Sequence, residues 1–464
     1  MTGHIPSIID LARRYDINGP RYTSYPTAPQ FREDFGPQQL RDAVAASNGD
    51  PIPNALSLYV HVPYCTSPCF YCGCNRIITR DTSRSEPYLQ RLDRESALIA
   101  PLFDADRPVV QLHFGGGTPN FLTPGQLVDT VQRLQQRFPF SADAERDISI
   151  ELDPRFIDAA GIATLAQAGF NRASLGVQDF DPDVQQAVNR IQSVEQTRAV
   201  VDACRAHGFR SVNIDLIYGL PKQTTDGFAR TLQTVLDIRP DRLAVYSYAH
   251  LPQLFKPQRQ LDASALPDAE TKLRLLQLAI DVLGDAGYAY IGMDHFALPD
   301  DSLTCAQRNG SLHRNFMGYT THAETDLVGL GVSAISRIGD SYSQNPRTLP
   351  EWEAAVDAGR LPVWRGMHCS DDDILRHMVI QQLMCHGRID SADIERQFHI
   401  DFAGYFADAL RQLQPLQADG LVQVDGHRIQ VTAQGRFLLR VIAMCFDAWL
   451  ARPAADRTRH ARAI

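Results

Sequence analysis

The chain gathers four of its nine cysteines in one stretch, Tyr59-Val-His-Val-Pro-Tyr-Cys-Thr-Ser-Pro-Cys-Phe-Tyr-Cys-Gly-Cys74. Cys65, Cys69 and Cys72 form a C-x3-C-x2-C pattern, and Cys74 follows after a single residue. Thiolates packed this closely can converge on one soft centre only if the backbone loops around it. Soft sulfur ligands select zinc, copper(I) or an iron–sulfur cluster.

A zinc site, disulfides and ordinary packing are the alternatives to an iron–sulfur site. A structural zinc site usually recruits a second ligand pair a dozen or more residues further on, and no such C-x2-C or H-x3-H pair follows. Disulfides are disfavoured because the remaining five cysteines are scattered singly and no secretion signal is apparent. Packing alone does not account for a cysteine-dense loop. The stretch therefore predicts an iron–sulfur site.

Length and composition set the class of protein. A chain of 464 residues indicates more than one domain, and 44% hydrophobic with 21% charged residues is typical of a globular protein. The net charge of −9 argues against a general nucleic-acid binder and gives no attraction to anionic membranes. No leader pattern or long apolar span is apparent. We expect a soluble, cytoplasmic monomer that binds neither nucleic acid nor membrane.

From about residue 56, strand-like and helix-like stretches alternate. Strands are expected at residues 56–61, 109–114, 147–152, 172–177, 211–217 and 242–247, and helices at 123–138, 158–168, 194–207 and 225–238. Six successive βα units require parallel strands, because each crossover helix returns the chain to the same edge. Six units are fewer than a closed eight-fold barrel. We therefore expect an α/β fold, an open (β/α)6 partial barrel, with functional residues at the C-terminal strand ends.

Several residues at these strand ends are candidates for ligand binding. Phe114-Gly-Gly-Gly-Thr-Pro119 follows the second strand, and its glycines let a ligand approach the backbone N–H groups closely. Glu151 ends the third strand, and Asp215 lies in an apolar fifth strand, where a carboxylate needs a partner. The residues alone also allow a tight turn, a surface carboxylate and a satisfied core aspartate.

The cysteine spacing after a first strand resembles the radical S-adenosylmethionine (SAM) superfamily, whose fold is the same partial barrel. The resemblance implies that Cys65, Cys69 and Cys72 hold a [4Fe–4S] cluster with one open iron that binds SAM. Cys74, in Cys-x-Cys-Asn, narrows the resemblance to the oxygen-independent coproporphyrinogen III oxidases (coproporphyrinogen dehydrogenases). The segment Arg21-Tyr-Thr-Ser-Tyr-Pro-Thr27 is similar to the N-terminal segment of the same family.

This resemblance implies an oxidoreductase of porphyrin and haem biosynthesis. The family converts two propionates of coproporphyrinogen III to vinyl groups, giving protoporphyrinogen IX through a 5′-deoxyadenosyl radical. A radical route is chemically reasonable because no side chain deprotonates an unactivated C–H at neutral pH. The resemblance further implies two SAM molecules, an electron donor for the cluster and an unknown final electron acceptor.

The resemblance also assigns site residues. It places Cys74 in catalysis and gives a cofactor-binding role to Tyr59, Tyr71, Gly116, Gly117, Thr118, Glu151, Gln178, Arg190, Asp215, Ala249 and Ile335. A substrate with four propionates needs arginines. The candidates in motif stretches are Arg21, Arg190, Arg308 and Arg314.

The chain is expected to have three parts. Residues 1–50 form an N-terminal segment near the active site, residues 51–345 the catalytic domain with its following loops, and residues 346–464 a mainly helical C-terminal domain. The last part is winged-helix-like, with alternating apolar positions around an Asp425-Gly426 turn. It carries no basic cluster, so a substrate lid or dimer surface is favoured over DNA contact.

A radical SAM-type haem chaperone is the alternative function. Such related proteins look different at the fourth cysteine and at the N-terminal segment, and this chain has both features. Beyond residue 290, three stretches have the pattern of loops and short elements and resemble signature stretches of the oxidases. They contain His295 and His313, which we leave unassigned because structural histidines are common.

Overall fold

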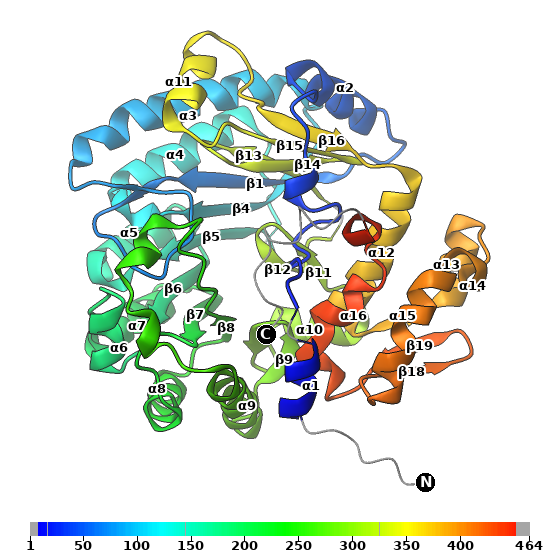
Figure 1. The fold of residues 1–464 in the computed structure, drawn as a ribbon. Helices are drawn as coiled ribbons and strands as arrows, with labels where there is room; N and C mark the ends of the chain where they lie inside the picture. The colour runs from blue at the N-terminus through cyan, green and yellow to red at the C-terminus, as the bar shows by residue number, and fades with distance from the viewer. Residues whose placement is uncertain (1–7, 16, 144, 324, 452–464) are drawn as a thin grey trace.

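A twelve-stranded sheet forms the body of the protein (Figure 1). The computed structural model describes residues 8–15, 17–143, 145–323 and 325–451. The centre of the sheet consists of parallel strands β1 (Ala55–Val62), β4 (Val109–Gly116), β5 (Asp147–Leu152), β6 (Arg172–Gln178), β7 (Ser211–Tyr218) and β8 (Arg242–Ser247). These are the six strands predicted from the sequence, with ends that differ by at most two residues. The partial barrel is confirmed.

Helices cover the outer face of these strands (Figure 1). They are α3 (Ser85–Ile99), α4 (Pro124–Arg137), α5 (Ala159–Gln167), α7 (Val194–Ala206), α8 (Thr225–Ile238) and α9 (Ala269–Asp285). Their starts follow from side-chain caps: Thr123 caps α4 in a capping box with Gln126, and the Asp158 carboxylate accepts from the Gly161 N–H at the start of α5. Both helices therefore begin directly after their capping residues.

The sheet extends beyond the six predicted strands on both sides. Beyond β8 lie β10 (His295–Ala297) and β9 (Ala289–Gly292), and beyond β1 lie β13 (Thr325–Leu330), β14 (Ile335–Ile338), β15 (Ser341–Gln344) and β16 (Arg365–His368). β13 is a seventh parallel strand beside β1. It is inconspicuous in the sequence because it contains Gly329, where a Cβ would lie 2.5 Å from the Ile335 carbonyl oxygen.

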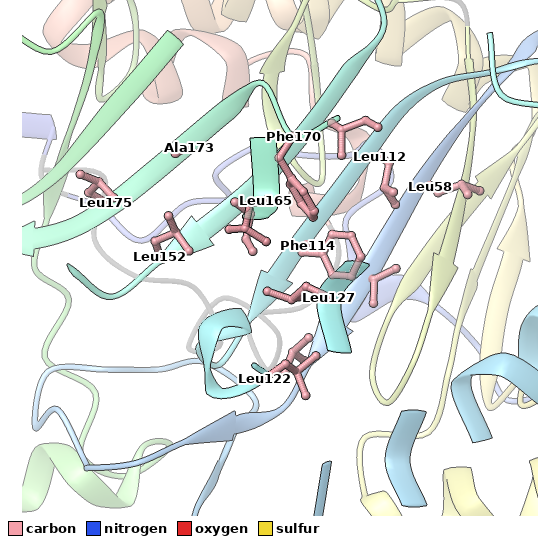
Figure 2. Close-up of a cluster of buried hydrophobic side chains, with 14 of the residues drawn as sticks. Leu58, Leu112, Phe114, Leu122, Leu127, Leu152, Leu165, Phe170, Ala173 and Leu175 are labelled. Carbon is pink, nitrogen blue, oxygen red and sulfur yellow. The ribbon is translucent and has the colours of Figure 1, made fainter. Parts of the chain in front are cut away.

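The main hydrophobic core lies between the sheet and the helices (Figure 2). Leu127 of α4 and Leu165 of α5 pack toward Phe114 of β4 and Phe170, whose ring centroids are 5.5 Å apart. Fully burying each of these side chains contributes about 1.5–3 kcal/mol. Because successive side chains in a strand point to opposite faces, the alternate, polar residues of the same strands face the barrel interior.

The C-terminal part packs around a second core. It contains α12 (Asp371–His386), α13 (Ser391–Phe398), α14 (Phe402–Tyr405), α15 (Ala407–Ala418) and α16 (Leu439–Met444). The predicted two-strand unit is present as β18 (Val422–Asp425) and β19 (Arg428–Val431), and β17 (Arg388–Asp390) adds a third strand. In the described ranges, no helix is both long and apolar enough to cross a bilayer.

The N-terminal segment joins the two cores. Figure 1 shows it in dark blue, running from α1 (Ile8–Tyr15) to α2 (Pro37–Asn48) at the top of the view. Leu11, Tyr22 and Tyr25 are buried in the C-terminal core. The segment is therefore fixed by packing on the C-terminal part of the chain.

Candidate cluster and cofactor site

The cysteine loop is closed at its base by a short pair of strands. β2 (Tyr64–Cys65) pairs with β3 (Ile77–Ile78) in parallel, which brings the two ends of the loop together. The guanidinium of Arg76 donates to the carbonyl oxygens of Cys69 at 3.1 Å and Cys72 at 3.2 Å. Arg76 thus holds the loop in its folded shape. Sequence reasoning missed this residue, because nothing in the motif indicates the direction of its side chain.

Each sulfur atom of the C-x3-C-x2-C pattern accepts a hydrogen bond. The Thr118 hydroxyl donates to Cys65 Sγ at 3.2 Å, and the Arg190 guanidinium donates to Cys69 Sγ at 3.5 Å. The backbone N–H of Cys74 donates to Cys72 Sγ at 3.4 Å. Donors of this kind stabilise sulfur atoms that carry negative charge.

The thiols differ in burial and in acidity. Cys65 and Cys69 are buried, Cys72 is half-buried and Cys74 is exposed. Burial raises the pKa of Cys65 to about 11, whereas the hydrogen bond from the Cys74 thiol lowers the pKa of Cys72 to about 6. Metal binding requires the thiolate forms and so releases protons from such groups.

The donor set fits a cluster better than a single ion. Within the described ranges, no group of three or more His, Cys, Asp or Glu side chains closes on one metal ion. The thiolates of an iron–sulfur cluster bind separate irons and so lie further apart than the ligands of one zinc ion. Cys65, Cys69 and Cys72 line one cavity, and each sulfur has a hydrogen-bond donor, which fits thiolate ligands of a cluster.

Three cavities meet beside the cysteine loop. The cluster cavity, of about 260 Å³, includes the four loop cysteines and Gly117 in its wall. The outer cavity, of about 330 Å³, is lined by Tyr59, Phe316 and Ile335. The barrel cavity, of about 160 Å³, is lined by polar residues that include His113 and Arg242. All three cavities share Glu151, so a ligand that contacts this carboxylate lies at their junction.

Nearly all predicted site residues line these cavities. The cluster cavity is lined by Cys65, Cys69, Tyr71, Cys72, Cys74, Gly116, Gly117, Thr118, Glu151, Gln178, Arg190 and Asp215. The outer cavity is lined by Tyr59, Cys74, Gly116, Glu151 and Ile335. Ala249 lines neither cavity. Its carbonyl oxygen accepts from Gln258 Nε2 at 3.1 Å, and the same amide donates to the Tyr71 carbonyl oxygen at 2.9 Å.

The glycine run cannot carry side chains. Gly116 has a φ of +115°, and a Cβ there would lie 2.6 Å from the His61 ring. A Cβ on Gly117 would lie 2.9 Å from the Pro63 backbone and from the Tyr64 carbonyl oxygen. Glycine is therefore required because this turn packs directly against His61 and the Pro63–Tyr64 backbone. The expectation that its N–H groups face a ligand is wrong, since the Gly116 N–H donates to Glu151 and the Gly117 N–H donates to the Val62 carbonyl oxygen at 2.8 Å.

Glu151 is held by two groups and still faces the cavities. Its carboxylate accepts from the Gly116 N–H at 3.1 Å and lies 3.5 Å from His113 Nε2. His113 Nδ1 in turn lies 2.7 Å from the Ser149 hydroxyl. The Glu151 side chain is 45% exposed, which leaves it available to a cationic group such as an ammonium. Sequence reasoning missed His113, whose signal is its alternate, inward-facing position on β4.

Asp215 has satisfied hydrogen bonds and an altered acidity. It accepts from Ser174 at 3.1 Å and from Asn213 at 2.7 Å. Burial, together with the nearby Glu151 carboxylate, raises the pKa of Asp215 to about 7. A satisfied core aspartate and a ligand-binding aspartate are both compatible with this geometry, because the residue is bonded and also lines the cavity.

Gln178 occupies a sparsely populated backbone conformation. Its φ is +74°, and it lies where the register between β6 and β7 shifts. Such left-handed non-glycine residues cost of order 1–3 kcal/mol and cluster at ligand sites. The irregularity places Gln178 in the wall of the cluster cavity.

The candidate substrate arginines are spread over different environments. Arg21 lies 3.5 Å from Asp294 and stacks over the Tyr246 ring, which lines the cluster and barrel cavities. Arg314 is only 4% exposed and stacks over Tyr319, and its Nε and Nη1 have no hydrogen-bond partner among the described residues. Arg308, on α10 (Ser302–Asn309), is exposed. None of these three arginines is itself in the wall of the three cavities.

The two unassigned histidines are neutral in this environment. Burial, reinforced by neighbouring arginines, lowers the pKa of His295 to about 3. Burial likewise lowers the pKa of His313 to about 4. His295 lines the barrel cavity, and His313 lies on β11 (His313–Asn315), outside the three cavities.

Comparison with known proteins gives consistent matches over the whole chain. The sequence model of the Radical SAM superfamily matches residues 59–235, and that of the HemN C-terminal domain matches residues 369–438. The oxygen-independent coproporphyrinogen III oxidase of Pseudomonas aeruginosa is 52% identical over 459 residues, which cover 98% of each chain. The protein of that name from Escherichia coli is 51% identical over 444 residues, which cover 96% of each chain. A solved structure is also similar, that of coproporphyrinogen III oxidase (HemN) from Escherichia coli, which is described as a radical SAM enzyme. The two structures match with a TM-score of 0.89 and 50% sequence identity, over 92% of this chain and 97% of that chain.

Proposed function

The chain belongs to the oxygen-independent coproporphyrinogen III oxidase family of the radical SAM superfamily, and we propose that the cluster and outer cavities together form its reaction site. The protein is an oxidoreductase that converts two propionates of coproporphyrinogen III to vinyl groups. The observation that carries the proposal is the junction of the cavities at Glu151, beside the cysteine loop and the glycine turn.

The protein uses a [4Fe–4S] cluster and SAM. We assign Cys65, Cys69 and Cys72 as the cluster ligands, since their sulfur atoms have donors and share one cavity. When bound, the cluster supplies the electron that cleaves SAM to a 5′-deoxyadenosyl radical. The exposed Glu151 carboxylate suits the ammonium of the methionine moiety, and Gly116, Gly117 and Thr118 line the same cavity.

A second SAM is proposed on the far side of the cluster cavity. Gln178, Arg190 and Asp215 line that wall together, and Ala249 is tied to it through Gln258 and Tyr71. Tyr59 and Ile335 line the outer cavity and are assigned to the first cofactor with Glu151. Two cofactor molecules per substrate match the two propionates that react.

Cys74 is proposed to act at the substrate. It lines both the cluster and the outer cavity and is exposed, so a molecule in either space reaches its thiol. Abstraction of a hydrogen atom from the propionate β-carbon leaves a radical conjugated with the pyrrole. Release of carbon dioxide and transfer of one electron to an acceptor then form the vinyl group. The chain's own part is to orient the substrate and to exclude side reactions.

Arg21 and Arg314 are proposed to bind propionates that do not react. Arg21 stacks on a ring of the cavity wall, and Arg314 has two N–H groups without a partner among the described residues. A buried guanidinium without an anion is costly, so a carboxylate from the substrate would stabilise it. Arg308 is not assigned to this role because it is exposed on α10 and donates to the Pro299 carbonyl oxygen at 3.0 Å.

We propose the three-part organisation at residues 1–50, 51–345 and 346–464, a cytoplasmic location and a monomeric state without nucleic-acid or membrane partners. Two hydrophobic cores support a division of the chain, although α11 (Leu349–Asp357) and β16, beyond residue 345, still belong to the barrel core and its sheet. The N-terminal segment contributes to both cores. Nine free cysteines, all within the described ranges, support a reducing compartment. A separate electron donor and acceptor complete the proposed set of partners.

Anaerobic turnover tests the proposed function. Reconstituted protein with a reductant, SAM and an electron acceptor should form protoporphyrinogen IX from coproporphyrinogen III. Deuterium placed at the propionate β-carbon should appear in 5′-deoxyadenosine. Stoichiometric haem binding by a preparation with an intact cluster, without any vinyl product, would instead establish the chaperone alternative.

A further inference from the structure

Two of the three groups that donate hydrogen bonds to the cysteine sulfur atoms come from outside the cysteine loop. The backbone N–H that donates to Cys72 belongs to the loop itself, but Thr118 follows β4 and Arg190 follows α6 (Pro182–Ala187). Side chains from two different βα units therefore reach the sulfur atoms of Cys65 and Cys69. These contacts are not needed to close the loop, since β2, β3 and Arg76 already do so.

The Arg190 side chain is fixed in place by further partners. It is 6% exposed, and its Nη1 lies 3.1 Å from the Asp153 carboxylate as well as 3.5 Å from Cys69 Sγ. Its Nη2 donates to the Gly176 carbonyl oxygen. Asp153 also accepts from Arg155 at 2.7 Å, so two guanidinium groups share this one carboxylate. The pair of arginines leaves positive charge beside the Cys69 sulfur.

We propose that Arg190 and Thr118 set the reduction potential of the cluster by donating hydrogen bonds to two of its thiolate ligands. The inference rests on the proposed assignment of Cys65 and Cys69 as ligands. Reduction adds one electron to the cluster and its sulfur atoms, with no bond broken. Donors and positive charge beside the sulfur stabilise the reduced form more than the oxidised form, and so raise the potential.

The proposal gives Arg190 a role besides contact with a second cofactor. A residue that only binds SAM would change cofactor affinity and leave the potential of the SAM-free protein unaltered. A residue that donates to Cys69 changes the potential before any cofactor or substrate is added. The two roles are therefore separated by measuring the cluster alone.

The test is a dithionite titration of anaerobically reconstituted full-length protein, followed by electron paramagnetic resonance, without SAM or substrate. Arg190→Gln and Thr118→Val should retain their iron and have a more negative midpoint potential than the wild type. Arg155→Gln is the matched control, because it removes a guanidinium from the same Asp153 carboxylate but contacts no sulfur. Because Arg155 lines the cluster cavity but donates no hydrogen bond to a sulfur atom, the loss of its charge alone should shift the potential by clearly less than Arg190→Gln does.

Unchanged potentials in iron-replete Arg190→Gln and Thr118→Val would overturn the proposal, as would an equal shift in Arg155→Gln. If Arg190→Gln does not hold iron, Thr118→Val decides alone, because valine keeps the shape of threonine and removes only the hydroxyl. Because the readout requires no turnover, a negative result here leaves the proposed function intact. If the wild-type protein bound no cluster on reconstitution, that result would contradict the assignment of Cys65, Cys69 and Cys72 as ligands instead.

Discussion

A pH dependence of folding is predicted at Glu95, a buried carboxyl of α3 that lies outside the candidate site. It accepts hydrogen bonds from the Gly331 N–H at 2.8 Å, from Asn345 Nδ2 at 2.6 Å and from Trp352 Nε1 at 3.1 Å. These partners tie α3 to the turn after β13 and to α11 (Leu349–Asp357). Burial outweighs the three donors and raises the pKa of Glu95 from 4.5 to about 7.

The sign and size of the effect follow from that shift. Because the folded protein holds the proton more tightly than the unfolded chain, Glu95 contributes most to stability below pH 4.5, and this contribution is lost as the pH rises through about 7. Each pKa unit corresponds to about 1.4 kcal/mol, so the full loss is about 3 kcal/mol. Glu95→Gln removes the titration with little change of shape.

The assay is the free energy of unfolding in urea, measured by tryptophan fluorescence between about pH 4.5 and 8. The difference between wild type and Glu95→Gln should change by about 3 kcal/mol over this range, in the direction of a relatively less stable wild type at high pH. Glu86→Gln is the matched control, since Glu86 is exposed on the same helix. A Glu95→Gln difference that stays constant with pH would refute the reasoning.

The remaining predictions concern the site. Wild-type protein should bind about four irons per chain, and Cys69→Ser should lose them; retention of iron in that variant would disprove the ligand assignment. Cys74→Ala should keep its iron and lose turnover. Loss of the cluster in this variant would mean that Cys74 is a cluster ligand and that one of the other three cysteines is not. Glu151→Ala should weaken SAM binding by a few kcal/mol in equilibrium measurements, the usual effect of removing a charge-assisted bond, and equal affinity would exclude an ammonium contact.

Much of the fold can be predicted because its strands are plain in the sequence. The six central strands are short apolar runs separated by well-capped helices, and their predicted ends lie within two residues of the observed ones. β13 escapes prediction because Gly329 and the glycines around it resemble a loop, whereas its place in the sheet depends on contacts distant in sequence. Its residue Asp326 pairs with buried Arg107 at 2.6 Å, more than two hundred positions away.

The residues of the candidate site likewise fall into those that the sequence predicts and those that it does not. The cysteines, the glycine turn and Glu151 follow from spacing and from the rule that strand ends form the site, and they do line shared cavities. Arg76 could not be found, because its role depends on side-chain direction, whereas His113 was missed although its alternate position on β4 marks it as facing inward. Ala249 is recognisable only by family resemblance, since a methyl group carries no chemical signal of its own.

The packing of the N-terminal segment bears on the order in which the protein is made. Tyr22 is buried in the C-terminal core and donates a hydrogen bond to Asp447 at 2.9 Å. The ribosome releases these two residues at opposite ends of synthesis, separated on the order of tens of seconds at ordinary elongation rates. The barrel can form on the nascent chain, but Arg21, beside Tyr22, reaches the cavity wall only after translation is almost complete. Until then, the Tyr246 ring in the cavity wall lacks the Arg21 guanidinium that stacks on it, so this side of the site is the last to be completed.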